Sequence, residues 1–437
     1  MAKGPMPGAE AMSRQDPDTS ITEKGQHAPA TRVDDLSTPD GGRGWVVLAG
    51  CTIVSWWSIG TAQSFGVLQE ALLKENVSTS VNLLFVGSLS ASLVSAFAIF
   101  YARAMRAWGT RINAMLGISL MSLSGAISSV VYKDIGALFA AYGVLMGIGM
   151  GLTFTTVAVA PTQYFLHKRG LANGIVFAGG GAGGAVISVM MNSIIERLGL
   201  AWAFRIHCLL VAGTGLPAAF VIKERVPYKQ SGLVDWKMFR SVSFALLFLV
   251  GALGTFPLFV PPYCVPTFAS SLGLSSSTGA SLTAAFNAAS ALGRIGSGLL
   301  CDRLGPLNVL FTALILLGAS MFLIWPFASS LGPLIVFVIV AGITVGSFFS
   351  TMPTAVGHIF GSANMSLIMG MILTGWTGGY LMGPPLAGFI LNANGGEDSG
   401  IGPYRPAMFF AGALALGSAS LVAIIRSRRS PRFLTKI

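Results

Sequence analysis

The sequence predicts an all-α polytopic membrane protein with twelve transmembrane helices arranged as two six-helix halves. Only 10% of the 437 residues are charged, whereas 53% are apolar. The apolar residues fall into about twelve blocks of roughly 18–25 residues, the length that crosses a hydrocarbon core about 30 Å thick. These blocks are apolar on all sides, and a backbone inside a bilayer must satisfy its own hydrogen bonds, so each block is expected to be a helix.

The twelve expected spans divide into two sets around one long polar break. The first set is Trp45–Phe65, Leu83–Tyr101, Ile112–Val131, Ala137–Ala160, Leu171–Ile195 and Phe204–Ile222. The second set is Ser241–Pro262, Thr278–Leu300, Leu307–Pro326, Pro333–Thr354, Ser366–Leu391 and Met408–Ile425. The Pro-rich stretch Pro257, Pro261, Pro262 and Pro266 is expected to end the seventh span, and Pro384-Pro385 to interrupt the eleventh, because proline lacks a backbone donor.

The polar segments give the domain organisation. Residues 1–40 are expected to form a disordered cytoplasmic tail, because they contain no apolar run. Residues 41–222 and 241–426 form the two halves, 223–240 a cytoplasmic linker and 427–437 a second cytoplasmic tail. A plan of two six-helix halves is typical of secondary carriers, which place their binding site at the midplane between the halves.

The net charge of +11 is explained by the orientation of the chain in the membrane. With both termini in the cytoplasm, most of the 27 Lys and Arg residues lie in cytoplasmic loops and tails, as the positive-inside rule requires. The exceptions are Lys74, Lys133, Arg197, Arg205 and Arg405 on the outer side and Arg294 inside a span. The charge therefore implies no nucleic-acid partner.

Several classes of site find no support in the sequence. The four cysteines lack CxxC pairing, which disfavours a disulfide framework or a zinc site. No phosphate-binding loop is present for ATP-driven pumping, and no paired carboxylates or activated nucleophile indicate an enzyme. His207, in the sixth span, is the remaining membrane residue whose charge could change near neutral pH, but a lone histidine in a helix is more often a hydrogen-bonded packing residue. We therefore expect no cofactor and no metal.

Two segments carry a family resemblance. Asp40-Gly41-Gly42-Arg43-Gly44-Trp45 opens the first span, and Ser64-Phe65-Gly66-Val67 follows near its end. Tyr164-Phe165 and Arg169-Gly170-Leu171-Ala172-Asn173-Gly174 lead into the fifth span. Together they resemble the two signatures of the monocarboxylate transporter family, fungal branch, within the major facilitator superfamily. The resemblance extends from Asp40 to the C-terminus and implies a major facilitator fold that works by alternating access.

Two further features indicate gating. Gly298, Asp302, Arg303 and Gly305 match the superfamily pattern Gly-x-x-x-Asp-Arg/Lys-x-Gly, in which a carboxylate and a guanidinium beside helix ends can form a clasp. The equivalent loop of the first half, Ala102–Gly109, has no acid.

The run Ala178–Gly184 has five glycines in seven residues. We expect a moving contact between the halves here, with Gly180 and Gly184 among the residues that let helices approach.

Arg294 is the leading candidate for substrate binding. A buried charge is costly and normally faces the interior with a partner, so the alternatives are a counter-ion for an anionic substrate or a structural arginine. The resemblance favours the first, since the family places an arginine here that engages substrate carboxylate. The family's proton-coupled animal members also have an aspartate where this chain has Ser290 and a lysine where it has Gln63. Proton coupling through those two groups cannot operate here.

Neutral polar groups take the place of those charges. Gln63, Ser64 and Asn287 lie on helices expected to line the cavity, together with Ser290. No Asp or Glu falls within the expected spans, because Glu70 and Glu196 lie just beyond span ends. A cavity with one arginine, amides and aromatic walls suits a larger, weakly acidic or amphipathic cargo better than lactate.

The sequence therefore predicts a secondary active transporter of a small organic anion or secondary metabolite, tilted toward efflux. The alternatives are a proton-linked monocarboxylate importer and, from another class, a non-transporting sensor. The plasma membrane is the expected location, with a vacuolar membrane as the alternative. Asn76-Val77-Ser78 is a glycosylation sequon on the outer side, but its loop is short and close to the bilayer, which disfavours its use.

Overall fold

The computed structural model describes residues 41–165, 169–225, 236–360, 365–396 and 400–429. The predicted N-terminal tail and most of the predicted linker and of the predicted C-terminal tail lie outside these ranges. Within them every regular element is a helix, as the all-α prediction requires.

The first half occupies residues 43–221. Its elements are α2 (Arg43–Lys74), α3 (Ser80–Ala96), α4 (Ala98–Trp108), α5 (Thr110–Val131), α6 (Ile135–Leu138), η1 (Phe139–Met146), α7 (Gly147–Val159), η2 (Ala160–Gln163), α8 (Arg169–Leu198) and α9 (Leu200–Val221). Each of the first six predicted spans corresponds to one of these helices or to a consecutive series of them.

The second half follows a short helical segment, η3 (Trp236–Arg240). Its elements are α10 (Val242–Gly254), η4 (Phe256–Leu258), α11 (Val260–Ser271), α12 (Ser276–Leu304), α13 (Pro306–Leu323), η5 (Trp325–Phe327), α14 (Leu331–Phe360), α15 (Met365–Ala393) and α16 (Tyr404–Arg429). Again each predicted span has a helical counterpart.

Nine helical segments among the described residues are long and apolar enough to cross a membrane, or ten if α3 and α4 count as one span. The helices α12 and α15 fall outside that set. The first of them is rich in Ser, Thr, Gly and Asn because it packs between other helices, α8 and α14, where small residues allow close approach.

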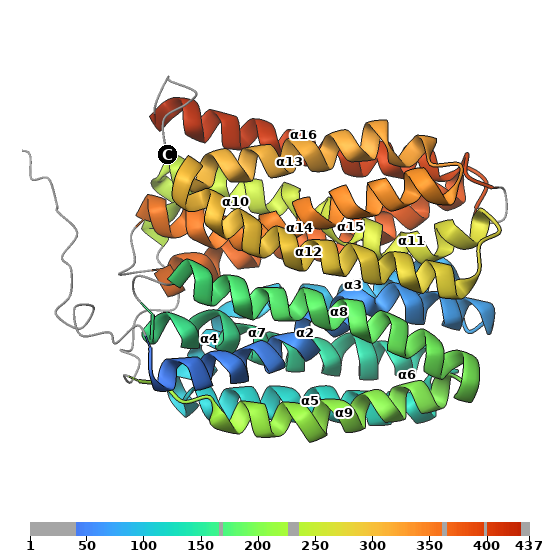
Figure 1. The fold of residues 1–437 in the computed structure, drawn as a ribbon, viewed down its shortest axis with the longest axis horizontal. Coiled ribbons are helices and arrows are strands. Elements are labelled where there is room, and N and C mark those ends of the chain that lie inside the picture. Colours follow the sequence, from blue (N-terminus) through green and yellow to red (C-terminus); the bar gives the residue numbers. More distant parts are fainter. Residues whose placement is uncertain (1–40, 166–168, 226–235, 361–364, 397–399, 430–437) are drawn as a thin grey trace, which may run out of the picture. The chain divides into compact units, whose positions relative to one another are not determined.

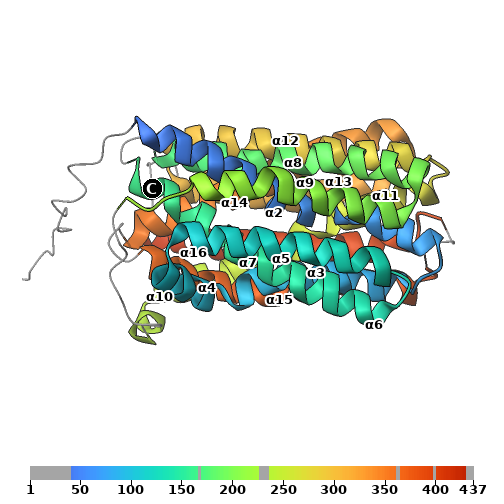
Figure 2. The ribbon, with the colours of Figure 1, turned by 90° about the horizontal axis from the view of Figure 1, so that it is seen from below.

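The two halves lie side by side, with α2 to α9 on one side and α10 to α16 on the other (Figure 1). The helices α8 and α12 pack together between the halves, as do α3 and α15. Figure 2 shows the same bundle of nearly parallel helices from a perpendicular direction. We call the end where α2 begins and α16 ends the terminal end, and the opposite end the distal end.

Three spans depart from straight α-helix. The second bends by 57° between α3 and α4. The fourth contains the π-helix η1, a form often found at functional sites. The seventh changes from α-helix to the short helix η4 around Pro257, but it then continues as α11 to Ser271, so its prolines do not end the span at Pro262 as predicted. The eleventh does not break: α15 continues through Pro384 and Pro385, so the predicted interruption there was wrong.

The two signature segments meet at the terminal end. A side chain on Gly44 would place its Cβ 3.0 Å from Tyr164 Cβ, so a glycine is needed for α2 to approach this closely. The rings of Trp45 and Phe165 contact each other edge-on with centroids 5.1 Å apart. The resemblance to two separate motifs therefore corresponds to one packed junction.

The loop Ala102–Gly109 of the first half contains no acid in its own sequence, but an acid from elsewhere in the chain lies at its end. Glu224, which follows α9, accepts hydrogen bonds from the Thr110 backbone nitrogen at 2.9 Å and the Thr110 hydroxyl at 2.5 Å. A carboxylate that accepts from the first backbone donor of a helix is a stabilising cap, here at the start of α5. Burial raises the pKa of Glu224, but these hydrogen bonds outweigh it and hold the pKa below its ordinary value.

Candidate functional site

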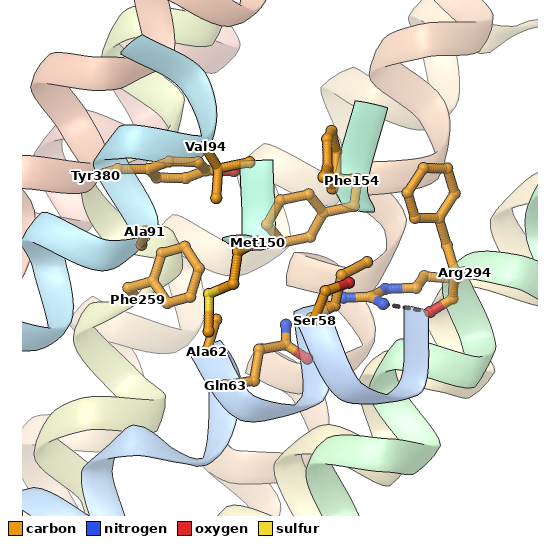
Figure 3. Close-up of a pocket in the computed structure, with 13 residues that line it drawn as sticks. Ser58, Ala62, Gln63, Ala91, Val94, Met150, Phe154, Phe259, Arg294 and Tyr380 are labelled. Carbon is orange, nitrogen blue, oxygen red and sulfur yellow. Dashed lines mark hydrogen bonds between the residues drawn. The ribbon is translucent and has the colours of Figure 1, made fainter. Parts of the chain in front are cut away.

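A cavity of about 50 Å³ lies between the two halves near the middle of the helices. This is room for a few water molecules only. Figure 3 shows the side chains that surround it. They are Ser58, Ile59, Ala62, Gln63, Ala91, Val94, Met150, Phe154, Phe177, Phe259, Arg294, Phe349 and Tyr380. The helices that contribute them come from both halves, so a molecule in this cavity would contact both.

Arg294 is the only charged residue in this lining, and it is fully buried. Its Nη1 donates a hydrogen bond to the backbone oxygen of Phe177, on α8 of the other half. Its guanidinium lies over the ring of Phe349, 5.2 Å from the centroid. Its Nε and Nη2 have no hydrogen-bond partner among the described residues. The buried positive charge is thus held by a carbonyl and a ring, with no carboxylate opposite it in the described part of the chain.

The unpaired Nε and Nη2 define one edge of the guanidinium. In an arginine these two nitrogens present parallel N–H groups that match the two oxygens of a carboxylate. The bond from Nη1 to Phe177 leaves that edge unused. Figure 3 shows the side chain reaching from α12 across toward Ser58 of α2. The guanidinium therefore keeps one edge without a hydrogen-bond partner among the described residues while it stays bonded to α8.

Three other polar side chains line the cavity: Ser58, Gln63 and Tyr380. The Ser58 hydroxyl and the Gln63 Oε1 have no hydrogen-bond partner among the described residues. Unpaired buried polar atoms are rare and call for a ligand, a water or an ion. These groups add neutral hydrogen-bonding capacity to a site whose one charge is positive.

The remaining lining is apolar and largely aromatic. The rings of Phe154 and Phe177 contact each other at 5.9 Å, and those of Phe259 and Tyr380 at 5.0 Å. Aromatic walls bury large apolar area and prefer offset or edge-on contact with other rings. Phe154, Phe259 and Tyr380 carry no mark in the sequence that assigns them to the wall beside Arg294. Their separation in sequence gives no signal that they meet.

The structure brings Gln63 and Arg294 together in the cavity but places the other predicted substrate residues behind it. Ser64 is buried and its hydroxyl donates to the Thr61 oxygen at 3.2 Å. Asn287 is buried and its Nδ2 donates to the Gln63 backbone oxygen at 3.4 Å, which links α12 to α2. Ser290 is buried with its hydroxyl unpaired among the described residues.

The glycine run of α8 lies at a crossing of helices from both halves. A Cβ on Gly181 would lie 2.9 Å from the backbone nitrogen of Ala291, and one on Gly184 would lie 2.9 Å from the Asn287 side chain, both on α12. A Cβ on Gly180 would instead meet Ile59 of α2 at 2.7 Å. Missing side chains thus allow α8 to approach α12 and α2 at backbone distance.

The predicted clasp after the eighth span lies at the terminal end. Asp302 and Arg303 are exposed, and Gly298 is half-buried in the last turns of α12. Gly305 has φ of +87° and ends α12, with its nitrogen donating to the Cys301 oxygen at 3.0 Å. This left-handed conformation explains the glycine of the motif, because other residues adopt it at a steric cost.

Two other predicted residues have clear structural surroundings. His207 is buried, and its Nε2 lies 2.9 Å from the Thr61 hydroxyl, a hydrogen-bonded packing residue between α9 and α2. Asn76 is exposed at the distal end with φ of +54°. The Val77 nitrogen donates to the Leu72 oxygen at 3.2 Å, so Asn76 ends α2 in the left-handed conformation that Asn tolerates.

Comparison with known proteins agrees with this architecture. The family model described as "Major Facilitator Superfamily" matches residues 46–274 and 247–436. The chain belongs to the major facilitator superfamily. It is therefore an integral membrane protein and a secondary transporter of small-molecule cargo, and not an enzyme.

The chain is also similar to curated transporters from fungi. The aspyridones efflux protein apdF of Emericella nidulans is 27% identical over 385 residues, which cover 87% of this chain and 78% of that protein. The MFS transporter asaE of Aspergillus flavus is 26% identical over 409 residues, which cover 92% and 91%. The MFS-type transporter pytF of Aspergillus terreus is 32% identical over 291 residues, which cover 63% and 95%.

Proposed function

We propose that this transporter exports an amphipathic organic acid and that it does so through the cavity around Arg294. The proposal rests chiefly on one observation: a fully buried guanidinium with an unused Nε and Nη2 edge, at the boundary of the two halves. A carboxylate bound there would complete the hydrogen bonds of a buried charge that is otherwise satisfied by one carbonyl. A charge-assisted bidentate pair of this kind is among the strongest polar interactions in proteins.

The walls support the amphipathic character of the cargo. Gln63, Ser58 and Tyr380 can hydrogen-bond neutral groups, and the surrounding rings favour an apolar or aromatic body. Lactate would leave those aromatic faces uncovered. The present cavity of about 50 Å³ is smaller than such a cargo, so the halves must separate locally when cargo enters. This is consistent with a carrier that rocks between two open states.

The direction and topology in the proposal have separate support. One relative is named an efflux protein for aspyridones, and export is carried over to this chain as a proposal. The signature segments resemble those of monocarboxylate transporters, and their junction at Gly44 and Tyr164 is packed at backbone distance. The excess of Lys and Arg favours a cytoplasmic terminal end and an outward distal end. The plasma membrane is the proposed location.

The gating and modification residues remain part of the proposal. The crossing of α8 with α12 at the glycine run supplies a contact that can slide as the halves move. Asp302 and Arg303 at the terminal end would clasp in one of the two states. Asn76 at the distal end would face the side on which glycosylation occurs.

Flux of matched cargo through purified protein in sealed vesicles tests the proposed function. The panel pairs a bulky aromatic carboxylic acid with its neutral amide, and adds lactate under an imposed proton gradient with an internal pH dye. We expect the bulky acid to move faster than its amide and lactate not to acidify the vesicles beyond empty controls. Lactate entry with internal acidification would instead support a proton-linked monocarboxylate importer.

A further inference from the structure

The distal end holds a polar cluster that is not part of the cavity. Its members are Glu70 and Lys74 of α2, Ser270 of α11 and Ser276 of α12, and we call it the distal clasp. The sequence placed Glu70 beyond the first span, but α2 continues to Lys74 and Glu70 is only 4% exposed. Glu70 is the only buried carboxylate among the residues that the structure describes.

Glu70 joins the two halves. Its Oε1 accepts a hydrogen bond from the Ser270 hydroxyl at 2.7 Å and another from the Lys74 Nζ at 2.7 Å. The Lys74 Nζ also donates to the Ser276 hydroxyl. Both charges therefore come from the first half and both hydroxyls from the second. Hydrogen bonds to ionised groups are shorter and stronger than neutral ones, so this cluster favours contact of α2 with α11 and α12.

Close contacts between the halves, on the cavity side of the distal clasp, also close this end. A Cβ on Gly66 of α2 would overlap the Pro262 oxygen of α11. The Tyr263 hydroxyl donates to the Gly87 oxygen of α3 at 3.3 Å. The Tyr263 ring also packs on Phe65 with centroids 5.4 Å apart. The cavity is thus separated from the distal end by tight packing between the halves.

We propose that Glu70 is the gating residue of the distal entrance, which its clasp with Ser270 holds shut in this state. Opening this end separates α2 from α11 and α12, which removes both serines and exposes the buried Glu70 to water, whereas Lys74 is already exposed. An ionised carboxylate is well solvated in the open state and hydrogen-bonded in the shut state, so each state satisfies it. A permanent seal has no need of a buried charge, because apolar residues of similar volume would stabilise it at least as well.

The proposal rests on the proposed alternating-access function but not on the cargo. Its test uses a variant in which Cys51, Cys208, Cys264 and Cys301, which are all buried and form no disulfide, are replaced by alanine or serine. Ala91→Cys then places a single thiol in the cavity wall. A membrane-impermeant maleimide is added on the side opposite a C-terminal epitope tag, and the labelling rate is measured. No cargo is needed, so a failure of acid export would not affect this readout.

Glu70→Gln is expected to raise the labelling rate at least about tenfold, because the hydrogen bond from Ser270 across the halves is then no longer to a charged group and the ion pair with Lys74 is lost. Ser270→Ala, on the other half, is expected to raise it by a smaller factor. The double variant should label no faster than Glu70→Gln alone, because both changes break the same contact. Glu75→Gln is the matched control, since Glu75 is an exposed carboxylate at the end of the same helix.

Unchanged labelling in both Glu70→Gln and Ser270→Ala would overturn the proposal. An equal rise from both sides of the membrane would overturn it as well, because that result indicates a loosened fold and not an opened distal entrance. If Glu70→Gln fails to reach the membrane, Ser270→Ala decides alone. A rise confined to the distal side would support the clasp.

Discussion

Replacing Arg294 by lysine should weaken the binding of acidic cargo and leave the binding of neutral cargo largely unchanged. Lysine keeps the charge but presents a compact ammonium in place of the planar fork, so a carboxylate loses one of its two parallel hydrogen bonds. A hydrogen bond to a charged group contributes about 1.5–3 kcal/mol, and each 1.4 kcal/mol is tenfold in affinity. The apparent affinity for an aromatic carboxylic acid should therefore fall about tenfold to a hundredfold. Arg294→Gln, which also removes the charge, should lower this affinity further.

The assay is the concentration dependence of flux in proteoliposomes, with the neutral amide of the same acid as an internal reference. Arg205→Lys is the matched control, because Arg205 is exposed on α9 and contacts the ring of Trp202. Since Arg294 also bonds to Phe177 on the other half, the melting temperature of each variant is measured in parallel. An equal loss for acid and amide would refute the reasoning, because it would assign Arg294 to the packing of the halves.

Three other changes follow from particular contacts. Gly181→Ala should lower flux at least about tenfold in protein that still inserts, because overpacking costs about 1–3 kcal/mol; Gly213→Ala, where nothing lies within 4 Å, should keep it. Tyr380→Phe should leave the melting temperature unchanged. It should lower the affinity for cargo that hydrogen-bonds to this hydroxyl by roughly threefold to tenfold. Glu224→Gln should remove about 1 kcal/mol of helix capping and lower the melting temperature at pH 7. Because hydrogen bonds from Thr110 hold the pKa of Glu224 down, that stability is present above the ordinary value of 4.5 and is lost as the pH falls through the lowered value. The difference in melting temperature between Glu224→Gln and the parent should therefore become smaller at acid pH, and a constant difference would contradict the capping role. Flux that is unchanged by Gly181→Ala or Tyr380→Phe would contradict the roles assigned to those residues.

The spans could be predicted from the sequence because bilayer thickness fixes their length and apolarity. Their internal shape could not. The bend between α3 and α4 has no proline to announce it, and α15 continues through Pro384 and Pro385 where an interruption was expected. Neighbouring helices can satisfy the backbone groups that a proline leaves free, so proline alone does not decide where a membrane helix ends.

The candidate site was partly predictable for a similar reason. Arg294 could be identified from the sequence because a charged residue inside an apolar span is costly and usually marks a functional site. Tyr380 and Phe349 carry no such mark, since aromatic residues are common in every span and only the folded contacts select those beside the guanidinium. Glu70 was placed outside the first span because hydropathy marks where apolar residues stop and not where a helix stops.

A structure of the carrier in lipid nanodiscs with a bulky aromatic acid bound tests the central claim most directly. The account predicts density for the cargo between the halves, with its carboxylate on the Nε and Nη2 edge of Arg294 and its apolar body against Phe259 and Tyr380. Cargo bound elsewhere, or in the cavity with its carboxylate away from Arg294, would contradict the account.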